Sequence, residues 1–190
     1  MSMARKTNEF NADEIGKLLL KQLPVIFNNI DETMAIERYL LSWRSQVDFC
    51  SYYGFQGMNK TERAEVYKFL TDNMGQHTCP SIAECLKKLQ KITKNVHLSF
   101  ASKIMASLDR NLPVYDKWVN RHLGLNHPHG NFSDAETTYH LLVARMQMLL
   151  ENKKVRKAIK KFDHRFPRFK LKKYLTDTKK LDIMLWQMRD

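Results

Sequence analysis

Residues Val96 to Leu125 read VHLSFASKIMASLDRNLPVYDKWVNRHLGL and carry the most informative pattern in the chain. Its apolar residues recur at helical spacing, first over 95–108 and again over 114–123. Asn111, Leu112 and Pro113 interrupt this pattern, because a proline ends or kinks a helix near the residue before it. We therefore expect a buried helix, a break, and a second helix that opens near Asp116.

The same helical spacing extends over most of the chain. Asn11, Asn59 and Ser133 are each followed by a Glu three residues later, which is the pattern of a capped helix N-terminus. Pro80 is expected as the first residue of another helix, and Thr178 as the cap of the last one. No segment alternates apolar and polar residues for long, so no sheet is expected. The prediction is one all-α domain over 1–190, with about eight to ten helices.

Composition is that of an ordinary globular chain. The 190 residues are 43% hydrophobic and 27% charged, and a chain of this length buries a core without disulfides or metal. Cys50, Cys79 and Cys85 form no C-x-x-C pair, so we expect three reduced, mostly buried thiols. No apolar run approaches a membrane span, and no apolar core follows the N-terminal charges. We expect a cytoplasmic protein without a membrane partner, and the sequence sets no oligomeric state.

The positive charge is concentrated in one part of the chain. The formal net charge is +12, and residues 151–180 hold 13 Lys or Arg against 3 acids. A block of this kind attracts polyanions, of which nucleic acid is the commonest, whereas the alternative is a solvated helix face. The candidate nucleic-acid-binding residues are Arg121, Lys153, Lys154, Arg156, Lys157, Lys160, Lys161, Arg165 and Arg168.

Aromatic residues interleave with these cations at spacings of three to five. They are Phe162, Phe166, Phe169 and Tyr174. Such rings can stack on nucleobases, but the same spacing docks a helix on a core. We expect docking on the core.

No strong catalytic motif is present: the chain lacks a phosphate-binding P-loop, G-x-G-x-x-G, H-E-x-x-H and G-x-S-x-G. His127 and His129 lie in a loop, where solvated side chains are favoured over metal ligands, so no metal or cofactor is expected.

Lys103 lies in the apolar helix, and Asp116 lies where a carboxylate caps free N–H groups. A partly buried amine beside a carboxylate is the chemistry of a Schiff-base nucleophile with an electrostatic partner.

Residues Pro113-Val114-Tyr115-Asp116-Lys117-Trp118-Val119-Asn120-Arg121-His122-Leu123 resemble a motif of the helix-hairpin-helix DNA glycosylases, the endonuclease III and 8-oxoguanine glycosylase superfamily. In that superfamily a segment P-V-D-T-H-V-x-R-x-L carries the catalytic Asp. Here Tyr115 is inserted before the Asp. The resemblance implies a glycosylase-like helical fold in which Lys103 and Asp116 are the catalytic residues. It also implies that the basic segment 151–180 binds the phosphates of the nucleic acid.

The hairpin that precedes this motif is degenerate. The family has L-P-G-V-G, whereas residues 95–100 contain no Gly. Alignment puts Phe100 at the place of the family's Lys, with Lys103 about one turn further on. The cluster-binding cysteines of the endonuclease III branch are missing. Three functions follow as alternatives: a DNA glycosylase or lyase, a non-catalytic helical module that binds nucleic acid, and a protein-interaction module.

Overall fold

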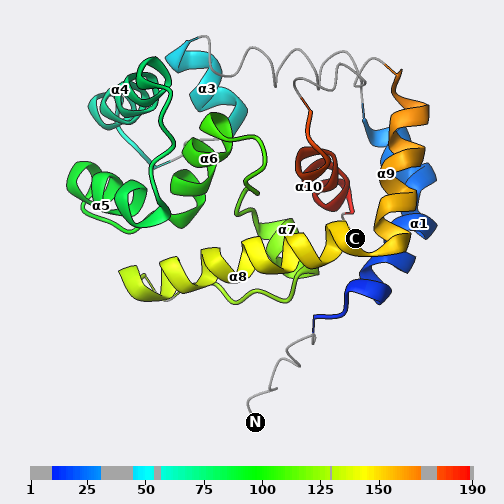
Figure 1. Cartoon of the computed structure of the whole chain (residues 1–190). Helices are drawn as coiled ribbons and strands as arrows, with labels where there is room; N and C mark the ends of the chain where they lie inside the picture. Colours follow the sequence, from blue (N-terminus) through cyan, green and yellow to red (C-terminus); the bar gives the residue numbers. More distant parts are fainter. Residues whose placement is uncertain (1–9, 31–44, 54–56, 129, 168–174, 189–190) are drawn as a thin grey trace.

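A computed structural model of the chain describes residues 10–30, 45–53, 57–128, 130–167 and 175–188. These residues form nine helices and no strand, which confirms the all-α prediction (Figure 1). In chain order the helices are α1 (Ala12–Asn29), α3 (Gln46–Tyr53), α4 (Lys60–Gln76), α5 (Ile82–Thr93), α6 (Leu98–Leu108), α7 (Lys117–His122), α8 (Phe132–Glu151), α9 (Lys153–Arg165) and α10 (Asp177–Gln187).

The predicted caps of α1 and α4 are confirmed. The Asn11 side chain accepts hydrogen bonds from the backbone N–H groups of Asp13 and Glu14, which starts α1. At the start of α4, Asn59 and Glu62 bond to each other's backbone N–H groups, at 3.0 and 2.8 Å. Each cap satisfies N–H groups that the first turn of a helix leaves without a partner.

The starts of α5 and α8 differ from the prediction. α5 is capped by Ser81, which forms a capping box with Glu84, so Pro80 lies just outside the helix. α8 is capped by Asn131 in place of Ser133, because the Asn131 side chain reaches the Asp134 N–H at 2.7 Å. Competing polar residues near each start decided these boundaries, and spacing alone does not rank them.

The start of α10 also differs from the prediction. Thr176, not Thr178, caps this helix, because its hydroxyl oxygen accepts from the Lys179 N–H at 3.3 Å. The same hydroxyl donates to the Arg110 carbonyl in the loop after α6. The tertiary bond to Arg110 fixes Thr176 as the cap.

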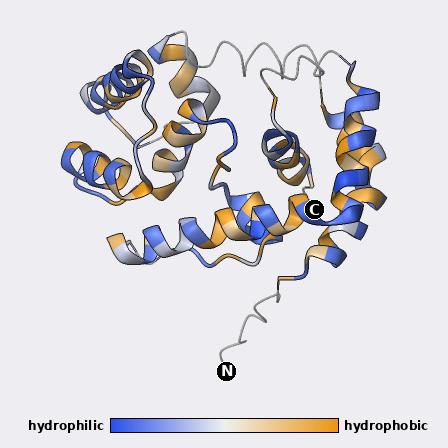
Figure 2. Ribbon diagram, in the orientation of Figure 1, coloured by the Kyte–Doolittle hydropathy of each residue, from blue (hydrophilic) through white to orange (hydrophobic). Residues whose placement is uncertain are grey.

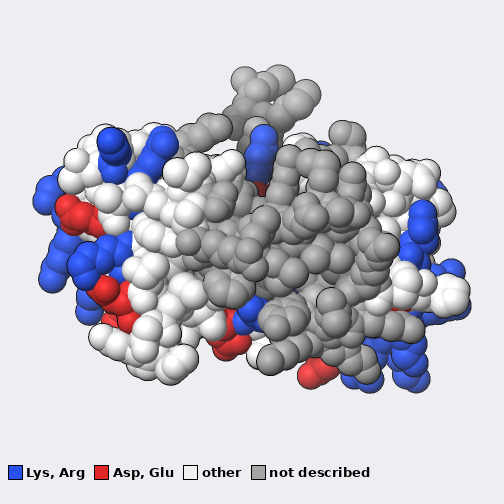
Figure 3. All heavy atoms as spheres, turned by 90° about the horizontal axis from the view of Figure 1, so that it is seen from above, with Lys and Arg blue, Asp and Glu red and all other residues white. Residues whose placement is uncertain are grey.

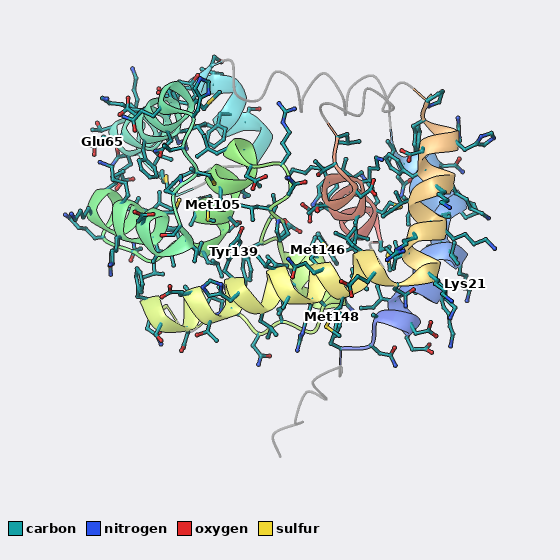
Figure 4. All side chains as sticks on the ribbon, viewed as in Figure 1. Lys21, Glu65, Met105, Tyr139, Met146 and Met148 are labelled. Atoms are coloured by element: carbon teal, nitrogen blue, oxygen red, sulfur yellow. The ribbon has the colours of Figure 1, made fainter. Side chains whose placement is uncertain are left out.

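The helices gather in two groups that meet along α8. Helices α3 to α6 pack on one another at one end, and α1, α9 and α10 pack together at the other (Figure 1). α8 contacts members of both groups. Its Met146 is buried and faces the other helices, whereas Met148 is 53% exposed on the far side (Figure 4). Figure 2 shows the same division along the other helices, whose apolar residues gather toward the interior.

α1 and α9 lie side by side and run in the same direction. At their starts, Lys154 forms an ion pair with Asp13. Near their ends, the Phe27 ring meets the rings of Phe162 and Phe166 edge-on, with centroids 6.2 and 5.4 Å apart. Gly16 permits this close approach, because an added Cβ would lie 2.9 Å from the Lys154 Cβ. This packing orients α9 and decides which of its residues face solvent.

The thiols differ from the prediction. All three are free, but only Cys85 is buried; Cys50 is half-buried and Cys79 is exposed. Burial raises the pKa of the Cys85 thiol to about 12. Cys79 lies in the connection before α5, where the helices leave it open to solvent.

Candidate functional site

The segment between α6 and α7 carries the predicted catalytic Asp and is held by two buried side chains. The Tyr115 N–H donates to the Ser102 hydroxyl on α6 at 2.9 Å, and that hydroxyl donates to the Ser99 carbonyl at 2.9 Å. The Val114 N–H donates to the Asp182 carboxylate on α10 at 3.2 Å. Two helices thus fix the backbone that leads to Asp116.

Asp116 is the N-cap of α7, as predicted. Its carboxylate accepts from the Trp118 N–H at 2.9 Å. Capping satisfies one of the free N–H groups of the first turn and fixes the direction of the carboxylate.

Lys103 lies on α6 within reach of the Asp116 charge. The side chain is half-buried, and its ammonium nitrogen lies 5.4 Å from the centre of the Phe100 ring. Burial lowers the pKa of Lys103, and the negative charge of Asp116 opposes this effect. The fold therefore places Asp116 near enough for its charge to act on the Lys103 amine. A less basic amine has more of the unprotonated, nucleophilic form near neutral pH.

The connection before Lys103 is a short turn between two helices. α5 ends at Thr93 and α6 begins at Leu98, with Lys94 in the left-handed region at φ 65°. Thr93 organises this turn, because its hydroxyl oxygen accepts from the Asn95 N–H at 3.3 Å. α6 has no side-chain cap, because the side chain of His97, its N-cap residue, forms no capping hydrogen bond. Phe100 is buried in the core.

α9 is the main basic element among the described residues. Its apolar face is buried through Val155, Ala158, Ile159 and Phe162. Lys154 is half-buried and paired with Asp13. The remaining cations of α9 are exposed and form no ion pair with any described residue: Lys153, Arg156, Lys157, Lys160, Lys161 and Arg165.

The space-filling view agrees with this arrangement. Seen from above, Lys and Arg gather at the edge where α1 and α9 lie, with few acids among them (Figure 3). At the opposite edge, over α4 and α5, Lys and Arg alternate with acids (Figure 3). The predicted basic surface is therefore a ridge along α9.

Arg121 and Arg168 do not extend this ridge. Arg121 is exposed, but it belongs to α7, which packs on α10. Arg168 lies outside the described residues, as do Phe169 and Tyr174. Phe162 and Phe166 are buried and contact each other and Phe27, which confirms that these two rings dock on the core.

Sequence reasoning missed a buried ion pair on α10. The Lys179 ammonium lies 3.6 Å from the Asp182 carboxylate, and both side chains are less than 10% exposed. Burial raises the pKa of Asp182 to about 6, against the opposing effects of the Lys179 charge and the Val114 N–H. The second carboxylate oxygen of Asp182 has no hydrogen bond among the described residues. The available signal was an acid three residues after a lysine, inside the apolar run at 181–185.

Lys180 is the second buried cation of α10. Its ammonium lies 2.9 Å from Asp163 on α9 and 2.9 Å from Asp177. Lys179 and Lys180 belong to the basic stretch 151–180, yet both are paired with acids inside the protein. They are structural cations and add nothing to the exposed ridge.

Metal-ligand clusters and membrane-spanning helices are both absent from the described part of the chain. No three His, Cys, Asp or Glu side chains there come together as metal ligands. None of the helices in those ranges is long and apolar enough to cross a membrane. Compared with protein-family models, curated proteins and solved structures, the chain matches none of them.

Proposed function

We propose that the chain binds nucleic acid through the exposed cations of α9. The observation that carries the proposal is the absence of acid partners for six exposed cations on this one helix, within the described residues. Each helical turn advances by about 5.4 Å, so successive turns of α9 present a cation along a line. A phosphate backbone is the linear polyanion that such a line complements.

A salt-dependent binding assay tests this proposal. Labelled duplex and single-stranded DNA are titrated with the protein at about 50 and 200 mM salt. The variant Lys153→Gln/Lys157→Gln/Lys160→Gln removes three charges from the ridge. We expect it to bind at least tenfold more weakly at low salt. Its salt dependence should fall by about one unit of slope for each phosphate that the variant no longer neutralises.

The matched control removes three exposed charges elsewhere. Lys87, Lys88 and Lys91 lie on α5, and the triple Gln variant lowers the net charge equally. It should bind nearly as well as the wild type. Equal losses in the two variants, or no binding at low salt, would contradict a nucleic-acid interface on α9.

A second candidate function is base excision or abasic-site lyase chemistry at Lys103. It is favoured by the half-buried amine, its lowered pKa and the nearby Asp116 carboxylate. In a lyase step the amine nitrogen adds to the C1′ aldehyde of an abasic sugar, water leaves, and an imine forms. The resemblance to helix-hairpin-helix glycosylases favours DNA as the substrate.

Borohydride trapping tests this second function. Abasic-site DNA is incubated with the protein, and borohydride then reduces any imine to a stable amine. A covalent adduct should form with the wild type and with the exposed neighbour variant Lys117→Ala, but not with Lys103→Ala. An adduct that survives in Lys103→Ala would exclude Lys103 as the nucleophile.

A further inference from the structure

A groove runs between α1 and α9 on one flank of the basic ridge. It is a cavity of about 340 Å³, lined by Leu20, Leu23, Phe27 and Asn28 of α1 and by Lys161 and Arg165 of α9. Its inner surface is apolar and aromatic, and cations stand at its α9 edge. Asn28 is exposed and carries both amide donors and an acceptor.

The aromatic wall of this groove is fixed in place. Phe27 is half-buried, and its ring meets Phe162 and Phe166 at interplanar angles of 68° and 85°. A ring held by two such contacts is preorganised, so a second flat group packing beside it orders little else. The groove therefore suits a planar chemical group that is attached to a negatively charged group.

The groove continues the line of cations on α9. Lys157, Lys161 and Arg165 follow one another at intervals of four residues, so they lie on the same side of the helix. If a polyanion binds along this row, the groups attached to its charged backbone lie over α1. The last two cations of the row, Lys161 and Arg165, line the groove together with Phe27 and Asn28.

The opposite flank of α9 has a different chemistry. Its cavity, of about 460 Å³, contains Arg156 and Lys160 but also Asp163 and Asp177, which hold Lys180. The two carboxylates offset two of the three cations that line this cavity, whereas no acid lines the α1 flank, and no aromatic side chain lines this cavity among the described residues. The α1 flank is therefore the better place for a base beside a phosphate.

We infer that the α1–α9 groove binds an unpaired nucleobase, and that single-stranded nucleic acid is the ligand class of this surface. The inference rests on the proposed nucleic-acid binding by α9. In a duplex the faces of the bases are stacked and covered, whereas in a single strand every base offers a flat face. Phe27 supplies the stacking contact, and Lys161 and Arg165 contact the flanking phosphates.

The test distinguishes binding of the bases from binding of the charged sugar-phosphate backbone. Fluorescence anisotropy is measured with three probes of equal length: a 20-nucleotide thymidine strand, a 20-nucleotide strand of abasic sugar phosphates, and a 20-base-pair duplex. The thymidine strand should bind about tenfold more tightly than the abasic strand, the size expected for a base stacked on an aromatic side chain. Equal affinity for these two strands would overturn the inference.

Two variants on α1 locate the effect. Phe27→Leu keeps an apolar side chain but removes the aromatic face, and it should weaken thymidine binding about fivefold while leaving abasic binding unchanged. Val25→Ala is the control, because Val25 is 61% exposed on α1 and does not line the groove. Equal effects of the two variants would overturn the inference. Thermal unfolding confirms that each variant is folded.

Photo-crosslinking gives a measurement that needs no variant. A thymidine strand containing 4-thiothymidine is irradiated with the wild-type protein, and the crosslinked peptide is identified by mass spectrometry. The crosslink should fall within residues 20–28 or on α9, and a crosslink confined to other helices would overturn the inference. Displacement of the strand by anionic phospholipid vesicles, with vesicle binding lost in Phe27→Leu, would assign the groove to lipid instead.

These outcomes distinguish the two proposals. If all three probes bind equally and the Lys153, Lys157 and Lys160 variant weakens all of them, α9 binds nucleic acid but the groove binds no base. If that variant changes no affinity, the proposed nucleic-acid function itself fails.

Discussion

α9 and the first turn of α10 both lie in the lysine-rich stretch 151–180, yet their cations are used in opposite ways. On α9, six cations are exposed and have no acid partner among the described residues. On α10, Lys179 and Lys180 are 5% and 4% exposed and lie next to carboxylates. A buried cation that is paired with an acid inside the fold is not available to a partner, whereas an exposed cation without an acid can attract one. A count of lysines along the sequence does not separate these two roles.

The strongest way to test this comparison is to remove one cation from each helix. Lys179→Met leaves the Asp182 carboxylate buried without this counter-charge, so we expect a loss of about 3–5 kcal/mol in the free energy of unfolding at pH 8. Lys157→Met removes a solvated charge and should change stability by less than about 0.5 kcal/mol. Urea unfolding measures both. Losses within about 1 kcal/mol of each other would mean that the two helices do not differ in this way.

The loss in Lys179→Met should shrink at acidic pH. Below the pKa of Asp182, about 6, the carboxyl group is neutral and no longer needs a cation. Repeating the unfolding at about pH 5 checks that the effect acts through Asp182.

A second test uses the pH dependence of stability. The pKa of Asp182 is about 6 in the folded protein, above its ordinary value of 3.8, so the folded state binds more protons between these values. The stability from this group is fully present below about pH 4 and is lost as the pH rises through about 6. We expect the stability of the wild type, relative to Asp182→Asn, to fall by about 3 kcal/mol from pH 4 to pH 8.

Unfolding of both proteins in parallel isolates this one group. Carboxylates that do not interact with Asp182 contribute equally in the two proteins, so their contributions cancel in the difference. A difference in unfolding free energy that stays constant with pH would show that Asp182 is not protonated in this range.

The smallest effect concerns how α9 is presented. Gly16→Ala places a Cβ 2.9 Å from the Lys154 Cβ and 3.0 Å from the Asn152 side-chain oxygen that caps α9. This overpacking should cost about 1–3 kcal/mol despite the better helix propensity of Ala. Gly75→Ala in α4 meets no atom within 4 Å and should stabilise the protein by up to about 1 kcal/mol. Thermal unfolding shows whether each variant is more or less stable than the wild type. A stabilising Gly16→Ala would show that α9 is not held by this contact.

Much of the fold could be predicted because helices leave local signals. The spacing of apolar residues indicated the helical class, and Asn11, Asn59 and Asp116 were recognised as caps from their residue type and position. Thr176 was missed because its choice depends on the Arg110 carbonyl, 66 residues away in the chain. A local pattern carries no information about such a partner.

The candidate site was predicted only in part. Lys103 and Asp116 were singled out from the sequence, but their closeness depends on Ser102 and Asp182, which hold the intervening backbone. Asp182 gave a weak signal, because one acid in an apolar run is equally consistent with an exposed position. The groove between α1 and α9 gave no signal, since its walls are separated by more than 100 residues.

Three properties follow from residues within a few turns of each other and can be read along the chain: the helical class, the amphipathic character of α9 and the concentration of charge in 151–180. Which lysines are exposed depends instead on how the helices pack. α10 is packed against α1, α7, α8 and α9, so its lysines are buried and must be paired, whereas α9 packs with one face open to water. Burial is set by neighbours that are distant in the chain, and burial decides whether a charge must be paired inside the fold or can attract a partner.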